Sequence, residues 1–417
     1  MKKILIANRG EIAARIIESC KRLGFSTVAV FSEADRTSPH LELADEACLI
    51  GPAPVEESYL STEQLLRAAA VAGADAVHPG YGFLSESPAF AEAVEAAGLT
   101  WIGPSVEALE SMGSKIRARE IAKEQGVPVI PAMTLLADAD FDAEKIVAAI
   151  GLPLLIKSSA GGGGIGMREV HAAQDLAQAI GDAREQSQRQ FHNADLLLEK
   201  LISRGRHIEV QVVADHHGKF LHLYERDCSA QRRRQKILEE APARDIPEDL
   251  LQALRDSALK LAKAVDYCGV GTVEFLLEGK DYYLLEMNTR LQVEHGVTEA
   301  VCQLDLVELQ LIIAGGEALP FDQKDISIIG HAIEARIYAE DPTAGFTPST
   351  GTITAYNPGN RTGLRIDAGV AAGNCVEHYY DGLLCKLIIT AKDRQAATTQ
   401  LRLAISELQL AGVKTNQ

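Results

Sequence analysis

The sequence lacks the features that would tie it to an oxidising compartment, a membrane or a nucleic acid. Its seven cysteines are odd in number, widely spaced and without a Cys-x-x-Cys pair, which favours free thiols in a reducing cytoplasm. No apolar run could span a bilayer, and the N-terminal residues 1–6 lack the long apolar core of a signal peptide. The net charge of −17 argues against nucleic-acid binding or a basic membrane surface. An anionic substrate would therefore need a local cationic pocket.

The phosphate-binding motifs of common nucleotide folds are also missing. The glycine-rich run 158–167 (SSAGGGGIGM) is not followed by the Gly-Lys-Ser/Thr of a P-loop. Residues 167–170 indicate a strand rather than a helix start, which argues against a dinucleotide fold. The run is then either an exposed linker or a flap whose backbone N–H groups close over phosphates. Lys157 ends the preceding apolar stretch, where it is either a phosphate ligand or a surface lysine.

The 417 residues are too many for one ordinary core, so several domains are expected. An apolar strand at 3–8, a helix at 11–23 and a second strand at 27–31 predict a parallel α/β unit. Further segments are expected as strand-to-loop transitions at 72–81 and 98–103, a helix at 114–125, a small unit at about 130–203, a strand-rich stretch at 204–300 and a β-rich unit from about 328.

Two predicted strands, 270–277 and 282–288, form a hairpin that carries Glu274, Glu286 and Asn288. Oxygen ligands on adjacent strands suit Mg²⁺, which binds carboxylates and bridges to substrate phosphates. A two-residue turn would place Glu274 and Glu286 on opposite faces, so the metal hypothesis predicts a three-residue or bulged loop. The alternative is two solvent-facing glutamates. We favour a metal site because Glu286 follows an apolar segment, where an unpaired carboxylate would be costly.

Two other segments could bind an anion. Residues 231–236 (QRRRQK) are the strongest cationic cluster of an acidic chain; an anion pocket is the preferred interpretation and a solvated helix face the alternative. Residues 289–295 (TRLQVEH) bring an arginine, an amide and a carboxylate close together, which could hold a planar oxyanion and remove its proton. His295 could be the base because of its ordinary pKa, but we favour its interpretation as a structural core histidine.

Six longer motifs follow one another along nearly the whole chain: IANRGEIAARI (6–16), HPGYGFLSE (78–86), KSSAGGGGIGM (157–167), ERDCSAQRRRQK (225–236), EMNTRLQVEH (286–295) and GHAIEARIYAEDP (330–342). Together they resemble the biotin carboxylase component of biotin-dependent carboxylases. The resemblance implies an ATP-grasp fold of the α/β (α+β) class. Its expected domains are a parallel α/β domain at 1–113, an ATP-grasp domain at 114–327 with a glycine-rich lid at about 130–203, and a β-rich C-terminal domain at 328–417, shortened at its end.

The resemblance implies an ATP-dependent ligase that forms a C–N bond. ATP would activate bicarbonate to carboxyphosphate, which decomposes to CO₂ and phosphate. The CO₂ would then carboxylate N1′ of biotin, whose proton is taken by phosphate. The implied cofactors are ATP and Mg²⁺ (or Mn²⁺), with bicarbonate as substrate and biotin as a carried substrate. The sequence has no Met-Lys-Met-like attachment site, so biotin is expected to arrive on another domain or chain.

Individual roles can be carried over onto matching positions. The resemblance implies that ATP is bound by Lys115, Lys157, Glu199, His207, Gln231 and Leu276, with the amides of Gly162, Gly163 and Gly164 over its phosphates. The implied metal ligands are Glu274, Glu286 and Asn288. Bicarbonate would be bound by Arg290, Gln292 and Val293, with Glu294 as its base. Lys236 would stabilise the charge of carboxyphosphate and Arg336 the biotin enolate.

The implied partners are a biotin carboxyl carrier protein or domain, a carboxyltransferase subunit and a second copy in a homodimer, with no nucleic acid or membrane. Three positions depart from the family pattern: Ile165 where Arg is frequent, Arg234 where His is frequent near the ribose, and Gly296 in place of Pro. Ile165 and Gly296 resemble urea- or guanidine-type carboxylases, whereas motif 330–342 resembles acyl-CoA carboxylases. We expect an acetyl- or propionyl-CoA type, with urea, guanidine and pyruvate carboxylases as alternatives.

Two other function classes compete with this one. Another ATP-grasp ligase, such as a carbamoyl-phosphate or purine-pathway enzyme, would also activate a carboxylate, but no other motif of those enzymes is found. A non-catalytic nucleotide-binding subunit would have lost site residues, whereas each expected ligand type is present.

Overall fold

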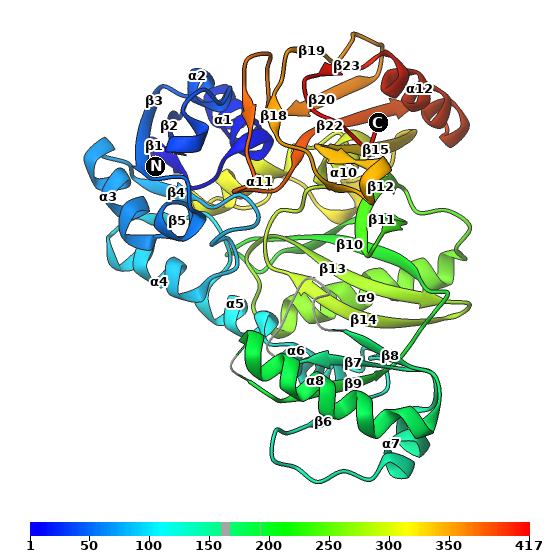
Figure 1. Cartoon of the computed structure of the whole chain (residues 1–417). Coiled ribbons are helices and arrows are strands. Elements are labelled where there is room, and N and C mark those ends of the chain that lie inside the picture. The colour runs from blue at the N-terminus through cyan, green and yellow to red at the C-terminus, as the bar shows by residue number, and fades with distance from the viewer. Residues whose placement is uncertain (160–166, 192) are drawn as a thin grey trace. The chain divides into compact units, whose positions relative to one another are not determined.

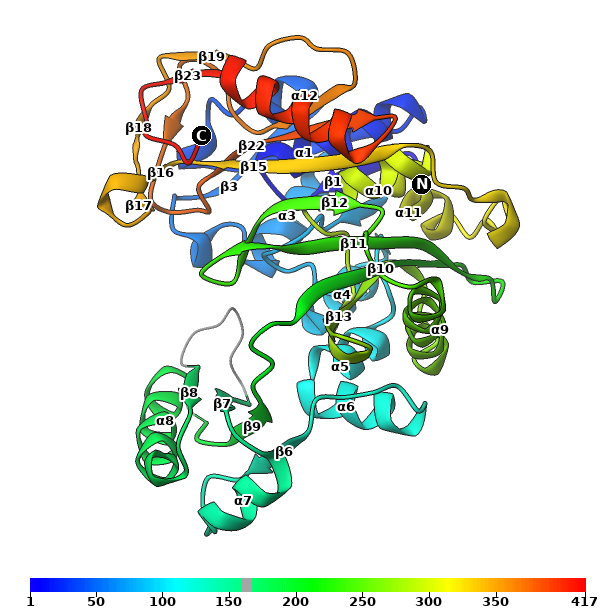
Figure 2. The same cartoon turned by 90° about the vertical axis from the view of Figure 1, so that its right-hand side faces the viewer.

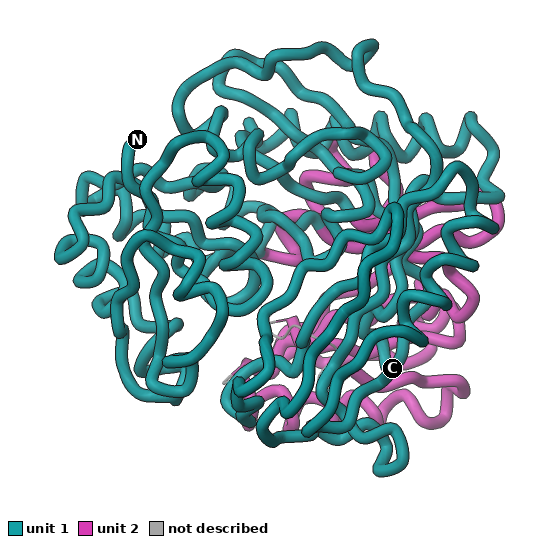
Figure 3. Tube along the Cα trace, turned by 90° about the horizontal axis from the view of Figure 1, so that it is seen from above, with its two compact units in different colours: residues 1–113, 208–273, 287–417 teal, residues 114–207, 274–286 magenta. Residues whose placement is uncertain are grey.

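The computed structural model describes residues 1–159, 167–191 and 193–417. They form two compact units, coloured in Figure 3: unit 1 comprises 1–113, 208–273 and 287–417, and unit 2 comprises 114–207 and 274–286. The chain passes between the units within strands β10 (Arg206–Ala214), β13 (Gly269–Glu278) and β14 (Asp281–Asn288). The core of the glycine run, with Gly162, Gly163, Gly164 and Ile165, lies outside the described residues, so the flap stays a prediction.

Unit 1 begins with a parallel sheet in the order β3-β2-β1-β4-β5 (Figure 1). Its elements are β1 (Lys3–Ile6), α1 (Gly10–Arg22), β2 (Ser26–Ser32), α2 (His40–Leu43), β3 (Glu46–Gly51), α3 (Thr62–Ala72), β4 (Ala76–His78), α4 (Pro88–Ala96), β5 (Thr100–Trp101) and α5 (Val106–Gly113). Helix α1 forms because Ile12, Ile16 and Cys20 recur at helical spacing and are buried. The predicted parallel α/β organisation is confirmed.

The second sheet has the strand order β14-β13-β10-β11-β12-β15-β22-β20, and its strands from β10 to β20 pair antiparallel. Its further strands are β11 (Phe220–Arg232), β12 (Gln235–Ala241), β15 (His331–Tyr338), β20 (Leu364–Ala368) and β22 (Leu383–Ala391). Helix α12 (Arg394–Glu407) covers one face (Figure 2), where it packs on Ile333 and Ile337 of β15. Because strand side chains alternate, Glu334 and Arg336 point to the opposite face, which helix α10 (His295–Cys302) covers.

The remaining elements of unit 1 are short or peripheral. The helices are α9 (Glu248–Ala264) and α11 (Leu306–Ala314), and the short strands are β16 (Glu340–Asp341), β17 (Thr347–Pro348), β18 (Gly351–Thr352), β19 (Ala355–Asn357), β21 (Cys375–Val376) and β23 (Gln409–Ala411). Short 3₁₀ helices occur at Glu33–Asp35, Val55–Glu57, Gln323–Asp325 and Pro342–Ala344. Among all described residues, no helix combines the length and apolar character needed to cross a membrane.

Unit 2 contains a four-stranded antiparallel sheet in the order β6-β9-β7-β8. Its elements are α6 (Lys115–Glu124), β6 (Ala132–Leu135), α7 (Ala143–Ile150), β7 (Leu154–Ser158), β8 (Arg168–Val170), a 3₁₀ turn (Ala173–Asp175), α8 (Leu176–Phe191) and β9 (Leu196–Lys200). Ile146 of α7 and Ile180 of α8 share one buried cluster with Leu154 and Leu196 of the sheet. Strand β7 before the glycine run and strand β8 after it confirm the two strands predicted on either side of it.

Two local expectations are wrong, and so is one alternative interpretation. Strands β13 and β14 are separated by only two residues, Gly279 and Lys280, so the predicted three-residue loop is absent. Of the two loop types that the metal hypothesis allowed, only the bulged one is left. Glu286 is exposed rather than buried. The cationic cluster 231–236 does not lie on a helix: it forms the turn between β11 and β12, where Arg233 and Arg234 adopt positive φ angles of 51° and 66°.

Candidate active site

Charged side chains line the face of the second sheet that α10 covers. Glu239 of β12 lies directly opposite Glu334 of β15, and Arg336 of β15 lies directly opposite Lys386 of β22. Lys386 is also paired with Asp367 of β20. All five residues are buried. Because buried charges are costly unless they serve as partners for one another or for a ligand, this row of residues is a candidate site.

Glu294 precedes α10 and lies between two cations. Lys236 Nζ donates to its Oε1 at 2.7 Å, and Arg336 Nη2 donates to its Oε2 at 2.9 Å. Burial alone would raise the pKa of Glu294, but the charges of Lys236 and Arg336 lower this pKa to about 2. The carboxylate is therefore ionised at neutral pH and can accept a proton.

Arg226 orients two neighbours of Glu294. This fully buried arginine donates from Nη2 to Glu209 Oε2 at 2.9 Å and to Gln292 Oε1 at 2.5 Å. The other Glu209 oxygen accepts from Lys236, which links Arg226 to Glu294 through alternating charges. Arg226 holds the amide oxygen of Gln292, and this contact fixes the orientation of the amide and of its NH₂ group. That group is a donor, which suits an oxyanion.

Residues next to Glu294 are also held by polar contacts. Arg290 donates from Nε to Glu86 Oε2 at 2.8 Å and from Nη2 to Asn288 Oδ1 at 2.8 Å. The carbonyl of Val293 accepts from Lys386 Nζ at 2.7 Å. His295 is fully buried and its Nδ1 lies 2.7 Å from the carbonyl oxygen of Gln292. Burial and nearby cations lower the pKa of His295 well below its usual value, which agrees with a structural histidine rather than with a base.

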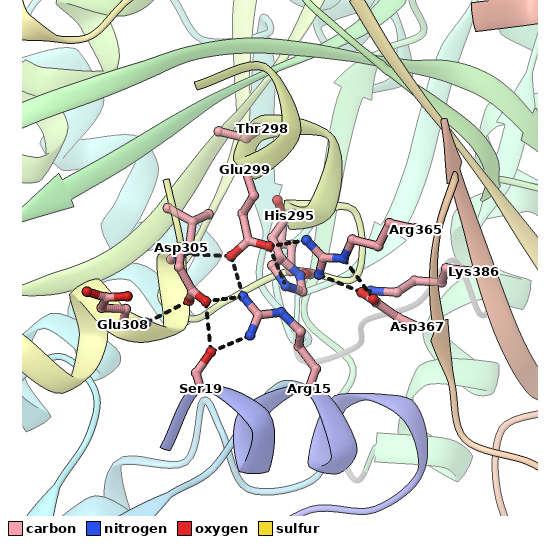
Figure 4. A network of polar contacts seen from close by, with 12 residues as sticks. Arg15, Ser19, His295, Thr298, Glu299, Asp305, Glu308, Arg365, Asp367 and Lys386 are labelled. Atoms are coloured by element: carbon pink, nitrogen blue, oxygen red, sulfur yellow. Dashed lines mark hydrogen bonds and ion pairs between the residues drawn. The ribbon is translucent and has the colours of Figure 1, made fainter. Parts of the chain in front are cut away.

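Lys386 belongs to a buried network that continues to α1. Its Nζ lies 3.3 Å from Glu11 Oε1 and 3.5 Å from Asp367 Oδ2. Figure 4 shows the continuation from Asp367 through Arg365 and Glu299 to Arg15, with closest ion-pair distances of 2.7, 2.6 and 2.8 Å. These alternating charges fix the strand that supports Val293, and thereby the segment that leads to Glu294.

The predicted nucleotide ligands of unit 2 form pairs. Glu199 of β9 accepts from Arg119 Nη1 at 3.0 Å and forms a close ion pair with Lys157 of β7. Burial lowers the pKa of Lys115, which is the first residue of α6, while Glu286 opposes this shift.

The other predicted metal and nucleotide residues lie as follows. His207 Nε2 is 2.8 Å from Glu274 Oε2 in unit 2. Leu276 packs against the backbone at Gly205, where a Cβ atom would clash with the leucine side chain. In unit 1, Gln231 lies directly opposite Lys236 across the β11–β12 turn and donates to the carbonyl of Cys228 at 2.9 Å.

The network around Glu294 brings together Lys236, Gln292 and Arg336, as the sequence predicted. It also contains residues that sequence reasoning missed: Glu11, Glu209, Arg226, Glu239, Glu334 and Lys386. The sequence could have indicated Glu209. It is a charged residue within the predicted strand 208–213, and a buried charge needs a partner. Arg226, Glu239, Glu334 and Lys386 depend on strand pairings, and Glu11 depends on the packing of helix α1 near Lys386.

Three regions of the chain match known protein domains. The N-terminal domain of biotin carboxylase matches residues 1–109, the ATP-binding domain of the carbamoyl-phosphate synthase L chain matches 114–322, and the C-terminal domain of biotin carboxylase matches 334–417. Biotin carboxylase of Halalkalibacterium halodurans is 49% identical over 416 residues, which cover 100% of this chain and 92% of that protein. The chain belongs to the biotin carboxylase family. It therefore has the ATP-grasp fold of that family, and it is an ATP-dependent ligase, as the sequence predicted.

Other biotin carboxylase relatives act within different enzymes. The mitochondrial methylcrotonoyl-CoA carboxylase subunit alpha of Glycine max is 48% identical and covers 100% of this chain, whereas the chain covers 57% of that subunit. A second relative is the biotin carboxylase domain dimer of the Hydrogenobacter thermophilus 2-oxoglutarate carboxylase, solved with MgADP, ADP and bicarbonate. Its structure matches with a TM-score of 0.94 and 43% identity, and the match covers 99% of this chain and 91% of that chain. The family is thus shown, while the acceptors of these relatives differ.

Proposed function

We propose that this protein uses ATP and bicarbonate to carboxylate biotin that is carried by another protein. The observation that carries the proposal is Glu294: an ionised, buried carboxylate held between Lys236 and Arg336, beside an amide whose oxygen Arg226 already occupies. A base surrounded by fixed donors is the arrangement needed to bind a small oxyanion and remove its proton.

Each side chain near Glu294 has one role in the proposed reaction. Arg290, the NH₂ of Gln292 and the Val293 segment bind bicarbonate, and Glu294 takes its O–H proton. The bicarbonate oxygen attacks the γ-phosphoryl group of ATP, and ADP leaves. The resulting carboxyphosphate splits into CO₂ and phosphate while Lys236 offsets its negative charge. Phosphate then takes the N1′ proton of biotin, Arg336 stabilises the enolate, and N1′ attacks CO₂.

The nucleotide ligands are assigned by residue chemistry and by the resemblance to the family. We propose Lys115, Lys157, Glu199, His207, Gln231 and Leu276, together with the amides of Gly162, Gly163 and Gly164. Two carboxylates and an amide oxygen, from Glu274, Glu286 and Asn288, fit the hard oxygen ligands that Mg²⁺ or Mn²⁺ prefers. When bound, the metal neutralises the phosphate charge of the nucleotide.

The wider assignments follow from the family. We propose an acyl-CoA carboxylase of the acetyl- or propionyl-CoA type, because motif 330–342 resembles those enzymes. Its partners would be a biotin carboxyl carrier and a carboxyltransferase, and its assembly a cytoplasmic homodimer. We also propose that the chain is divided into three domains, at 1–113, 114–327 and 328–417.

The test measures ADP release with MgATP and free biotin, with and without bicarbonate. Turnover should require bicarbonate, and Glu294→Gln should lower it by about 10²- to 10⁴-fold because the base is lost. Glu248→Gln is the matched control, since this exposed glutamate begins helix α9 and pairs with Arg255. ATP turnover that ignores bicarbonate would refute the function. Full activity of the Glu294→Gln variant would refute the base assignment.

A further inference from the structure

Two carboxyl groups face one another behind the proposed bicarbonate site. Glu239 and Glu334 are direct cross-strand partners on the face of the sheet covered by α10, and their side chains are almost completely buried. Arg336 Nη2 lies 2.7 Å from Glu239 Oε1. Neither oxygen of Glu334 has a hydrogen-bond partner among the residues that the structure describes. Glu334 is thus a buried carboxyl group without a donor to stabilise its charged form.

Every element packed around Glu334 contributes titratable or charged groups. They are Glu239 of β12, Arg336 of β15, Lys386 of β22, Glu294 and His295 at the start of α10, Glu11 of α1 and Tyr81 after β4. Among the cations, Lys386 has the largest charge effect on Glu334, but its ammonium is engaged by the Val293 carbonyl at 2.7 Å and lies close to Glu11 and Asp367. The first turn of α10 covers Glu334 closely, because a Cβ atom on Gly296 would lie 3.3 Å from Glu334 Oε2.

Two adjacent carboxylates in a site of low polarity cannot both ionise without a large cost. In the network around Glu294, the five carboxyl groups of Glu11, Glu209, Glu239, Glu294 and Glu334 face the four cations of Arg226, Lys236, Arg336 and Lys386. If all were ionised, the network would carry one net negative charge where an anion must bind. One retained proton makes it neutral.

We propose that the Glu239–Glu334 pair retains one proton at neutral pH, and that this proton leaves the charge of Arg336 available to Glu294 and to the anionic substrate. Burial raises the pKa of Glu239 to about 7, although Arg336 opposes this rise. Burial also raises the pKa of Glu334 well above its usual value, while Lys386 opposes it. Glu334 is a positioning residue in this proposal, because it acts through Arg336 and does not touch the substrate.

The kinetic consequence rests on the proposed function. As pH rises and the pair loses its proton, the added negative charge should weaken bicarbonate binding. The KM for bicarbonate should then rise by up to about tenfold for each pH unit, because one proton is coupled to binding. Glu334→Gln keeps the size and neutrality of the protonated side chain, so its KM for bicarbonate should stay flat between about pH 6 and about pH 9.

The matched control is Glu240→Gln in the full-length protein. Glu240 neighbours Glu239 in β12 but contacts His331 and Arg394 instead. Its variant should keep the wild-type rise of KM with pH. If the folded Glu334→Gln variant shows the same rise as wild type, the proposal is wrong. Should Glu334→Gln not fold, Glu334→Leu provides the same test, since leucine is neutral and suits a site without donors.

A second measurement does not depend on activity. Infrared spectra of the wild-type protein at neutral pH should contain a protonated carboxylic-acid C=O band that Glu334→Gln removes and Glu240→Gln retains. Identical bands in wild type and Glu334→Gln would overturn the retained proton. If the wild type lacks bicarbonate-dependent turnover, the proposed function fails, and the infrared comparison still decides whether the proton exists.

Discussion

Replacing Arg226 with lysine tests whether the orientation of Gln292 controls bicarbonate binding. Arg226 makes six side-chain hydrogen bonds, which reach Glu209, Gln211, Thr272, Gln292 and Thr298. A lysine at this position keeps the positive charge beside Glu209. Its ammonium has only three N–H donors on a single nitrogen, so it cannot reach the same acceptors in several directions.

The expected cost follows from the contacts that lysine cannot replace. At least three hydrogen bonds are lost, and each contributes about 1 kcal/mol net, which predicts a loss of about 3 kcal/mol in the free energy of unfolding. The larger penalty of about 3–5 kcal/mol for an unpaired buried charge does not apply, because the pair with Glu209 is kept. Losing the anchor of Gln292 should raise the KM for bicarbonate by about tenfold, which is the value of one hydrogen bond.

Urea unfolding followed by circular dichroism gives the stability, and bicarbonate-dependent ADP release gives the KM. Arg255→Lys is the matched control: it loses contacts with Glu225 of β11 and Glu248 of α9, so its stability should fall without a change in the KM for bicarbonate. A folded Arg226→Lys variant with the wild-type KM for bicarbonate would refute the proposed role of Gln292 orientation.

Two further predictions concern pH and ATP. Although burial opposes it, hydrogen bonds from His331 and Arg394 lower the pKa of Glu240 to about 2. This carboxylate therefore stabilises the fold above the pKa of the unfolded chain, and its contribution disappears as pH falls toward about 2. In urea unfolding at neutral pH, the free energy of unfolding of Glu240→Gln should be about 2 kcal/mol lower than that of wild type, a value that allows for the partial exposure of Glu240. In strong acid the two proteins should be equally stable. The same difference in stability at both pH values would contradict this prediction. Lys115→Met should raise the KM for ATP by about tenfold in steady-state kinetics and leave the KM for bicarbonate unchanged, because its ammonium is assigned to the nucleotide alone; a parallel change in both constants would contradict that assignment.

Much of the fold could be predicted because it depends on local patterns. The spacing of Ile12 and Ile16 predicted helix α1, and the strands on both sides of the glycine run were expected from their apolar residues. For the cationic cluster 231–236, the helix alternative is wrong, and the preferred anion pocket stays a prediction. Arg233 and Arg234 form a hairpin turn with left-handed φ angles. Arginine does not favour such angles, so the residue types of this segment did not predict the turn.

The sequence by itself determined the family and the chemical types of the site, because the motif 286–295 places Arg290, Gln292 and Glu294 within one short segment. Only the tertiary structure decided the electrostatic state of that segment. The ionisation of Glu294 depends on Lys236 and Arg336, and the proposed proton on Glu334 depends on its register opposite Glu239. These partners come from strands far apart in the chain, and strand register and burial, rather than residue type, set their distances and therefore their charges.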